Sequence, residues 1–311
     1  SHFQTELGIL SGAYNKTLED LLVAMESPEP QKTSDFSYKI AEPRQEVSHN
    51  LLKLNGHIKT RLGEWRMQYG FQNNNRREYD VRIGNLSKIP AIDLRLNTHT
   101  LEAEWETLHS EKKTLSVGLN GTYQQNDNIY GTQRIPFVPN FDNLSLGVFA
   151  VTKLLFNQWA VNLGARYDYR YFDVTGFNSV NNLYTASYHF NNVSATAGAT
   201  VDLRKSETLA LSVSAAWRPP HVSELYSSGK HQSVGSYENG LLITKSSQVI
   251  DIDEAHVNAE QALKFVTTYK RSLQNLTIEV GPYANYIFNY IYLRPEGVSN
   301  GLRGPGPAFW Y

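Results

Sequence analysis

The sequence predicts an all-β protein, and more specifically a transmembrane antiparallel β-barrel, on three observations. Apolar and polar residues alternate over segments longer than the strands of soluble proteins, as from Trp159 to Tyr171. Short polar turns alternate along the chain with long connections that are rich in Asn, Gly, Pro and Ser. No stretch approaches the roughly 18 consecutive apolar residues of a spanning helix, and the mean hydropathy is -0.43. A barrel explains all three, because its strands alternate between lipid-facing and lumen-facing side chains.

The clearest strand runs from Trp159 to Tyr171. Because successive side chains of a strand point to opposite faces, one face carries Trp159, Val161, Leu163, Ala165, Tyr167, Tyr169 and Tyr171, and the other carries Ala160, Asn162, Gly164, Arg166, Asp168 and Arg170. Strands of soluble sandwiches are usually about 5–6 residues long, whereas a tilted strand that crosses a membrane needs about 9–11. The segment therefore predicts a membrane-crossing strand with an extension into water.

Further strands show the same alternation. Their apolar rows are Trp65, Met67, Tyr69 and Phe71; Leu115, Val117 and Leu119; Leu209, Leu211, Val213, Ala215 and Trp217; and Leu276, Ile278 and Val280, continued by Tyr286, Phe288, Tyr290 and Tyr292. One segment departs from the pattern, because its apolar residues change parity between Leu96 and Leu101. A β-bulge near Asn97–Thr100 would restore one apolar face, and we expect one there.

The connections between these strands are of two kinds. Short turns are predicted at 61–63, 109–113, 156–158, 204–207 and 271–275, and long loops at about 14–43, 81–91, 126–141, 175–187, 219–249 and 294–311. In outer-membrane barrels, short turns lie in the periplasm and long loops lie outside the cell. A soluble sandwich or propeller is the alternative, but these folds use short strands with a turn about every 8–12 residues.

The strand count predicts a partial barrel. About eleven strands are expected, whereas bacterial barrels close with an even number of strands. The start Ser1–Gln4 has no signal-peptide pattern, and the end Phe309–Tyr311 follows no closing strand pattern. Residues 1–311 are therefore expected to form a partial β-barrel domain that is cut at both ends.

The composition excludes several classes of function. A formal net charge of -1 gives no basic surface for nucleic acid. Cysteine is absent, which excludes disulfides and thiolate metal sites. The sequence contains no Gly-x-Ser-x-Gly, no phosphate-binding glycine loop and no His-Glu-x-x-His. We therefore expect no enzymatic activity and no cofactor.

Three segments carry a family resemblance. The longest reads Ala216-Trp217-Arg218-Pro219-Pro220-His221-Val222-Ser223-Glu224-Leu225-Tyr226 and continues through Gly229-Lys230-His231 and Tyr237–Gly240. The second is Gly164-Ala165-Arg166-Tyr167-Asp168, and the third is Pro43–His49 followed by Tyr69–Tyr79. In this order they resemble the barrel domain of a TonB-dependent receptor, most closely the branch that takes up haem, zinc and iron chelates. In that family the strand after the loop usually carries a Glu, for which Glu254 and Glu260 are candidates.

The resemblance implies the middle part of a barrel of about 22 strands in the outer membrane of a Gram-negative bacterium. It also implies a plug domain with a TonB-box segment and a set of last strands, neither of which is in this chain. The implied partners are the TonB energy-transducing complex, the lipids of the outer membrane and a metal-chelate or haem ligand.

Four residues of the long loop are candidate ligand-binding residues: His221, Glu224, Tyr226 and His231. His and carboxylate groups suit zinc, and Tyr and His suit haem iron. Their spacing fits no compact metal motif, so the metal stays open, and loop histidines that are only solvated are the alternative.

A second set is expected to face the lumen, because its members lie on the polar faces of their strands: Arg166, Asp168, Arg170 and Arg218. The first three are expected to pair with neighbouring strands or with a plug. Arg218 precedes two prolines that end strand pairing, so a structural role is the other reading of the Arg-Pro-Pro turn.

Two functions are compatible with these features. The resemblance implies an active importer that binds a metal-containing nutrient (an iron chelate, haem, zinc or similar) at its extracellular loops and admits it by energised gating. A passive outer-membrane channel or a structural or adhesive barrel is the alternative, because the strand periodicity alone is equally compatible with it.

Overall fold

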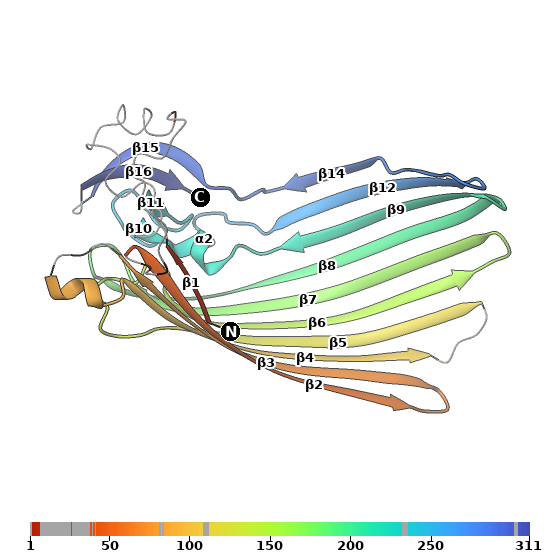
Figure 1. Cartoon of the computed structure of the whole chain (residues 1–311), viewed down its shortest axis with the longest axis horizontal. Helices are drawn as coiled ribbons and strands as arrows, with labels where there is room; N and C mark the ends of the chain where they lie inside the picture. Colours follow the sequence, from red (N-terminus) through yellow and green to blue (C-terminus); the bar gives the residue numbers. More distant parts are fainter. Residues whose placement is uncertain are drawn as a thin grey trace.

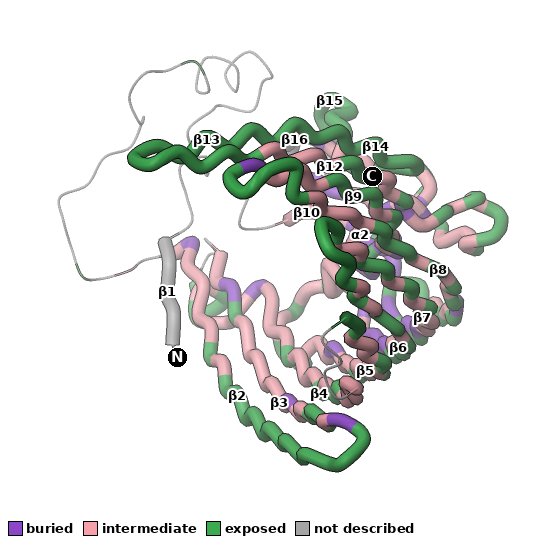
Figure 2. The backbone as a smooth tube through the Cα atoms, turned by 90° about the vertical axis from the view of Figure 1, so that its right-hand side faces the viewer, coloured by how far each residue is buried: buried purple, intermediate pink, exposed green. Residues whose placement is uncertain are grey.

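The structure is a computed structural model and describes residues 2–6, 26, 38, 40, 42–80, 82, 84–107, 112–231, 236–301 and 304–311. Its main element is a strongly curved antiparallel sheet whose long strands lie side by side (Figure 1). Seen along the strands, the sheet forms an open arc (Figure 2). No described helix is long and apolar enough to cross a membrane.

The strands of the sheet follow chain order, and each pairs with the next, except that the last two both pair with the strand before them. Its strands are β1 (His2–Glu6), β2 (Arg44–Lys59), β3 (Gly63–Tyr79), β4 (Ile92–Thr107), β5 (Lys113–Asn128), β6 (Asn140–Leu155), β7 (Trp159–Phe177), β8 (Leu183–Arg204), β9 (Glu207–Arg218), β12 (Glu260–Ser272), β13 (Thr277–Val280) and β14 (Tyr283–Phe288).

The twelve named strands of this sheet count as eleven when β13 and β14 are taken as one strand. β13 and β14 both pair with β12 in one register, since Val280 lies opposite Tyr269 and Tyr283 lies opposite Val266. Only Gly281 and Pro282 separate them, and proline has no N–H for the ladder. Taken as one interrupted strand they give the eleven antiparallel strands, and the open β-barrel wall, that the sequence predicts.

The two faces of the sheet differ as the alternation predicts. On the outer face, apolar side chains such as Leu146, Val148, Val193 and Leu211 are between 48% and 68% exposed. We call the opposite face the inner face; in β7 it carries Arg166, Asp168 and Arg170 and, further along, Phe172 and Val174, which are almost fully buried. An apolar face open to lipid and a mixed inner face are typical of a membrane barrel.

The prediction of a β-bulge in β4 is wrong. β4 pairs with β3 and with β5 without any shift of register. Leu96 lies on the inner face and packs against the buried core, whereas Leu101 lies on the outer face and is 51% exposed. The apolar residues change parity because the apolar surroundings of the strand change from the lipid side to the interior, so a regular strand satisfies both.

Strands extend further than the sequence predicts. Because β7 reaches Phe177 and β8 begins at Leu183, the connection predicted at 175–187 contains only 178–182. The connection predicted at 126–141 contains only 129–139, and that at 81–91 holds a short 3-10 helix, η1 (Gly84–Lys88). Most of the predicted loop 14–43 and residues 109–111 of a predicted turn lie outside the described residues.

The two remaining connections, predicted as irregular loops at 219–249 and 294–311, fold together. They form α2 (Val222–Tyr226), β10 (Ser228–His231), β11 (Ser236–Asn239), β15 (Arg294–Gly301) and β16 (Gly304–Trp310). The strands make a second sheet in the order β10-β11-β16-β15, in which β11 and β16 are parallel and Tyr237 lies opposite Ala308. We call α2, this sheet and residues 240–259 the cap; it lies at one end of the long strands (Figure 1).

The buried core joins the cap to the inner face of the barrel wall. The wall contributes Phe141, Phe172, Val174 and Tyr188, and the cap contributes Val222, Leu225, Tyr226 and Leu242. The ring centroids of Phe172 and Tyr188 are 5.0 Å apart, and those of Tyr184 and Tyr226 are 5.6 Å apart. Full burial of one such side chain stabilises by about 1.5–3 kcal/mol, so the cap is a packed unit on the wall.

Candidate functional site

Arg218 connects three parts of the chain where β9 ends. Its Nε donates to Oε2 of Glu260 at 2.7 Å, and its Nη1 donates to Oε2 of Glu224 at 2.7 Å. The other oxygen of Glu260 accepts from the backbone N–H of Ile291 at 2.7 Å. Arg218 therefore ties β9 to α2 and to the first residue of β12, and Glu260, of the two candidates, is the glutamate that it contacts.

The prolines that follow explain the local course of the chain. Pro219 and Pro220 are buried and have no N–H to offer a neighbouring strand. α2 begins two residues later, with His221 as its N-cap: the ring Nδ1 accepts from the N–H of Ser223, and the carboxylate of Glu224 accepts from the N–H of His221 at 2.7 Å. This reciprocal arrangement is a capping box.

The ring of His221 has solvent on one side and the packed cap on the other. Desolvation by the cap lowers the pKa of His221 below its ordinary value, and the nearby guanidinium groups of Arg170 and Arg218 lower it further, whereas the carboxylate of Glu224 opposes the shift. The ring also meets the edge of Phe141 at 6.2 Å between centroids. His221 is therefore placed as a neutral capping residue.

The other two loop candidates lie in different surroundings. Tyr226 is 2% exposed, and burial raises the pKa of its phenol. His231 lies in β10, where its Nδ1 is 2.9 Å from Oε1 of Glu238 and its ring stacks on Phe137 at 5.0 Å. The structure thus brings His221 and Glu224 together and places Tyr226 in the core and His231 in the second sheet. Among the described residues, no group of three or more His, Asp or Glu side chains has the geometry to hold a metal ion.

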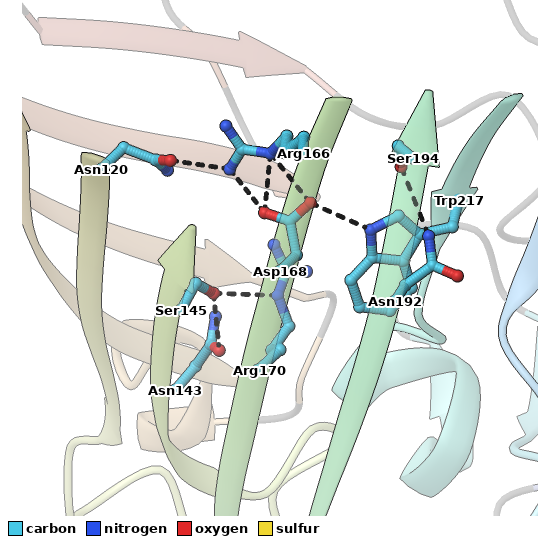
Figure 3. A network of polar contacts seen from close by, with 9 residues as sticks. All are labelled: Asn120, Asn143, Ser145, Arg166, Asp168, Arg170, Asn192, Ser194 and Trp217. Carbon is cyan, nitrogen blue, oxygen red and sulfur yellow. Dashed lines mark hydrogen bonds and ion pairs between the residues drawn. The ribbon is translucent and has the colours of Figure 1, made fainter. Parts of the chain in front are cut away.

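Three residues of the second predicted set, Arg166, Asp168 and Arg170, form polar contacts on the inner face (Figure 3), whereas Arg218 pairs with Glu224 and Glu260. Nε of Arg166 donates to both oxygens of Asp168 at 2.8 Å, and its Nη2 donates to Asn120 of β5 at 2.7 Å. Arg170 donates from Nε to the hydroxyl of Ser145 in β6 at 2.9 Å. The polar row of β7 is thereby cross-linked to its neighbour β6 and to β5 on the far side of β6.

Trp217 departs from its expected place. The alternation puts it on the outer face with Leu209, yet its indole N–H donates to Oδ2 of Asp168 at 3.3 Å (Figure 3). The pairing of β9 with β8 ends at Ala215, so beyond this residue β9 is paired only with β12, on its other side. Trp217 and Pro219 then close a recess of about 230 Å³ over Arg166, Asp168 and Arg170, which we call the wall recess.

A larger hollow lies between the cap and the connections after β3, β5 and β7. This mouth cavity has a volume of about 450 Å³. Three cationic and three aromatic side chains are in its lining: Arg134, Lys230, Lys245, Phe137, Tyr237 and Trp310. It adjoins a cavity of about 650 Å³ beside 128–140, with which it shares Arg134 and Phe137.

No sequence pattern predicts the mouth cavity. Its lining residues come from connections far apart in the chain, and Trp310 reaches it only because β16 pairs with β11. None of the four loop candidates lines it, although His231 stacks on Phe137, which does.

Comparison with known proteins supplies the family. Residues 8–310 match the family model described as "TonB dependent receptor-like, beta-barrel". Among curated proteins, none matches the chain.

Solved structures share the fold at low sequence identity. The ferric-catecholate import receptor Fiu from E. coli K12 superposes with a TM-score of 0.63 at 10% identity, over 95% of this chain and 48% of that one. The copper transporter OprC gives 0.58 at 12% identity, over 86% and 42%. The haemophore receptor HasR of Serratia marcescens, solved with its haemophore and haem, gives 0.57 at 13% identity, over 81% and 41%. The chain spans less than half of the length of each of these structures.

Proposed function

Because this chain belongs to the TonB-dependent receptor family, as part of its β-barrel domain, we propose that it serves to import a metal-containing nutrient across the outer membrane of a Gram-negative bacterium. The ligand, an iron chelate, haem, zinc or similar, binds at the extracellular loops. Gating energised by the TonB complex then admits it. The family is one of receptors rather than enzymes, in keeping with the lack of catalytic motifs.

The match of the barrel family over residues 8–310 is the observation that carries the proposal. The structure adds a physical reason to expect selective uptake. A passive pore needs an open mouth, but here the cap packs into the inner face through Leu225 and Tyr226, which are 0% and 2% exposed. A packed cap beside a cavity of ligand size suits recognition better than free passage.

The proposed roles of the loop candidates follow from their contacts. We propose that Glu224 and Tyr226 act by fixing the cap, because the first is bonded to Arg218 and the second is buried. His221 caps α2 and has one side in solvent. His231 is the candidate nearest to the mouth cavity, and we propose that it supports the ligand site through the ring of Phe137, on which it stacks.

Uptake by living cells tests the proposal. Cells that carry the gene and cells that lack it are given radioactive iron as a chelate or as haem, and radioactive zinc, each with and without a functional TonB complex. The proposal expects saturable accumulation of one of these nutrients that needs both the gene and the TonB complex.

Two results would point to other functions. Accumulation that needs the gene but persists without the TonB complex and does not saturate would indicate a passive channel. No gene-dependent accumulation of any probe would support a structural or adhesive barrel.

A further inference from the structure

The mouth cavity has a one-sided charge. Its lining holds Arg134, Lys230 and Lys245, and the described lining residues include no Asp or Glu. Two carboxylates lie nearby and are engaged: Asp80 accepts from Arg134 at 2.8 Å, and Glu238 is bonded to His231 and to Ser236. The side chain of Glu238 projects away from the cavity, because its strand neighbours Tyr237 and Asn239 line it.

The rest of the lining combines aromatic and aliphatic residues with neutral polar ones such as Ser179, Asn239 and Thr244. Phe137, Tyr237 and Trp310 present aromatic rings from the connection after β5, from β11 and from β16. A volume of about 450 Å³ falls within the range of small-molecule sites, which is about 300–1,000 Å³. Aromatic walls with a few cationic groups recognise ring-bearing anions, since rings stack on rings and cations pair with the charge.

The wall recess has the same sign of charge. Two guanidinium groups, those of Arg166 and Arg170, line it with a single carboxylate, that of Asp168. The recess belongs to the barrel wall and shares no lining residue with the mouth cavity. Two separate sites that a cargo would meet on the inner side of the protein therefore favour negative charge.

From these two sites we infer the chemical class of the cargo: an anionic metal chelate with aromatic donor rings, held in the mouth cavity by Lys230, Lys245 and Trp310. The inference rests on the proposed import function and narrows it. A bare metal cation is disfavoured, because it would meet lysines at this site where it needs carboxylate or imidazole ligands.

Binding to the purified protein tests the inference. The protein, in detergent and in the longest form that its gene encodes, is titrated with ferric tris-catecholate, which is an aromatic anion. A neutral ferric tris-hydroxamate without rings and free Zn²⁺ are the comparison probes. The inference expects the catecholate complex to bind more tightly than both, with an affinity that falls as salt is raised from about 50 to about 300 mM.

Variants of single lining residues test whether the catecholate complex binds in the mouth cavity. Lys245→Gln should weaken binding of the catecholate complex by about tenfold at low salt, and Lys245→Arg, which keeps the charge, should restore it. Trp310→Leu should weaken binding without changing its salt dependence. Lys205→Gln is the matched control, because Lys205 is exposed in the turn between β8 and β9, and this variant should bind as the parent does.

Equal or tighter binding of the neutral complex or of Zn²⁺ would overturn the inference, as would unchanged binding in Lys245→Gln. These results are separable from the uptake test. Energised uptake of a neutral chelate would uphold the importer and refute the cargo class, whereas charge-dependent binding without energised uptake would uphold the cargo class and refute the importer.

Discussion

Replacing Arg218 by methionine should loosen the cap from the barrel wall. The substitution keeps much of the aliphatic stem and removes the two charged hydrogen bonds to Glu224 and Glu260, each 2.7 Å long. The two glutamate side chains are only 15% and 10% exposed, so they would keep charges that water reaches poorly.

The magnitude follows from the exposure of the three groups. A hydrogen bond to a charged group contributes about 1.5–3 kcal/mol when it is well buried. The side chain of Arg218 is 43% exposed, so solvent screening reduces that figure for each bond. We expect a total loss of about 1–3 kcal/mol in the free energy that opposes opening of the cap, which is about a 5- to 150-fold larger open population.

Amide hydrogen exchange measures this opening directly. The relevant N–H groups are those of Leu225, Ser227, Leu241 and Leu242, which donate to backbone carbonyls within the cap. Their exchange should accelerate about 5- to 150-fold in Arg218→Met. Glu260→Gln should lower the free energy that opposes opening of the cap by less in the Arg218→Met background than in the parent protein, because the ion pair is already broken in that background.

Arg204→Met is the control, because Arg204 is 75% exposed and pairs with Glu207 at the opposite end of β9. Exchange in the cap should be unchanged in it. An acceleration below about twofold in Arg218→Met would refute the idea that Arg218 holds the cap.

Three further predictions concern the same region. Because the pKa of His221 is lowered in the closed cap, the opened cap binds a proton more readily than the closed one. The cap should therefore be stable above a pH of about 6.5 and lose stability as the pH falls below it. His221→Asn, which caps a helix without titrating, should remove this pH dependence from the amide exchange of α2. Leu225 is 0% exposed, so Leu225→Ala should cost about 2–5 kcal/mol of cap stability, read as faster proteolysis of residues 240–259, whereas Leu211→Ala on the outer face should leave that rate unchanged. A Cβ at Gly240 would lie 2.3 Å from the carbonyl carbon of Leu225, so Gly240→Ala should break the hydrogen bond from its N–H to Ser227 and expose the same segment to protease; cleavage at the parent rate would contradict either of these two predictions.

The alternation of side chains made the barrel wall predictable. In β7 the residues from Trp159 to Tyr171 show which face meets lipid, because no other element has to pack against that face. The same rule failed in β4, where Leu96 is apolar because it packs against the buried core on the inner face. The pattern of apolar residues in a strand shows that a side chain lies in apolar surroundings. It does not show whether lipid or the protein core provides those surroundings.

The candidate site was predictable only where its parts are close in sequence. Arg218, Glu224 and His221 lie within one short motif, and the structure brings them together. The choice of Glu260 over Glu254 depends on strand register, and the inward turn of Trp217 depends on where β8 and β9 separate. The mouth cavity depends on the pairing of β11 with β16, about 70 residues apart in the chain.

Both cavities lie on the inner face of the sheet, and single-cysteine labelling measures most directly which face is the interior. The chain contains no cysteine, so spin labels at Val193→Cys, Ser194→Cys, Leu211→Cys and Ser212→Cys report one position each in outer-membrane vesicles. If the apolar face is the outer one, labels at 193 and 211 collide with oxygen dissolved in lipid, and labels at 194 and 212 collide with a water-soluble nickel chelate. The reverse pattern, or equal access to nickel at all four positions, would contradict it.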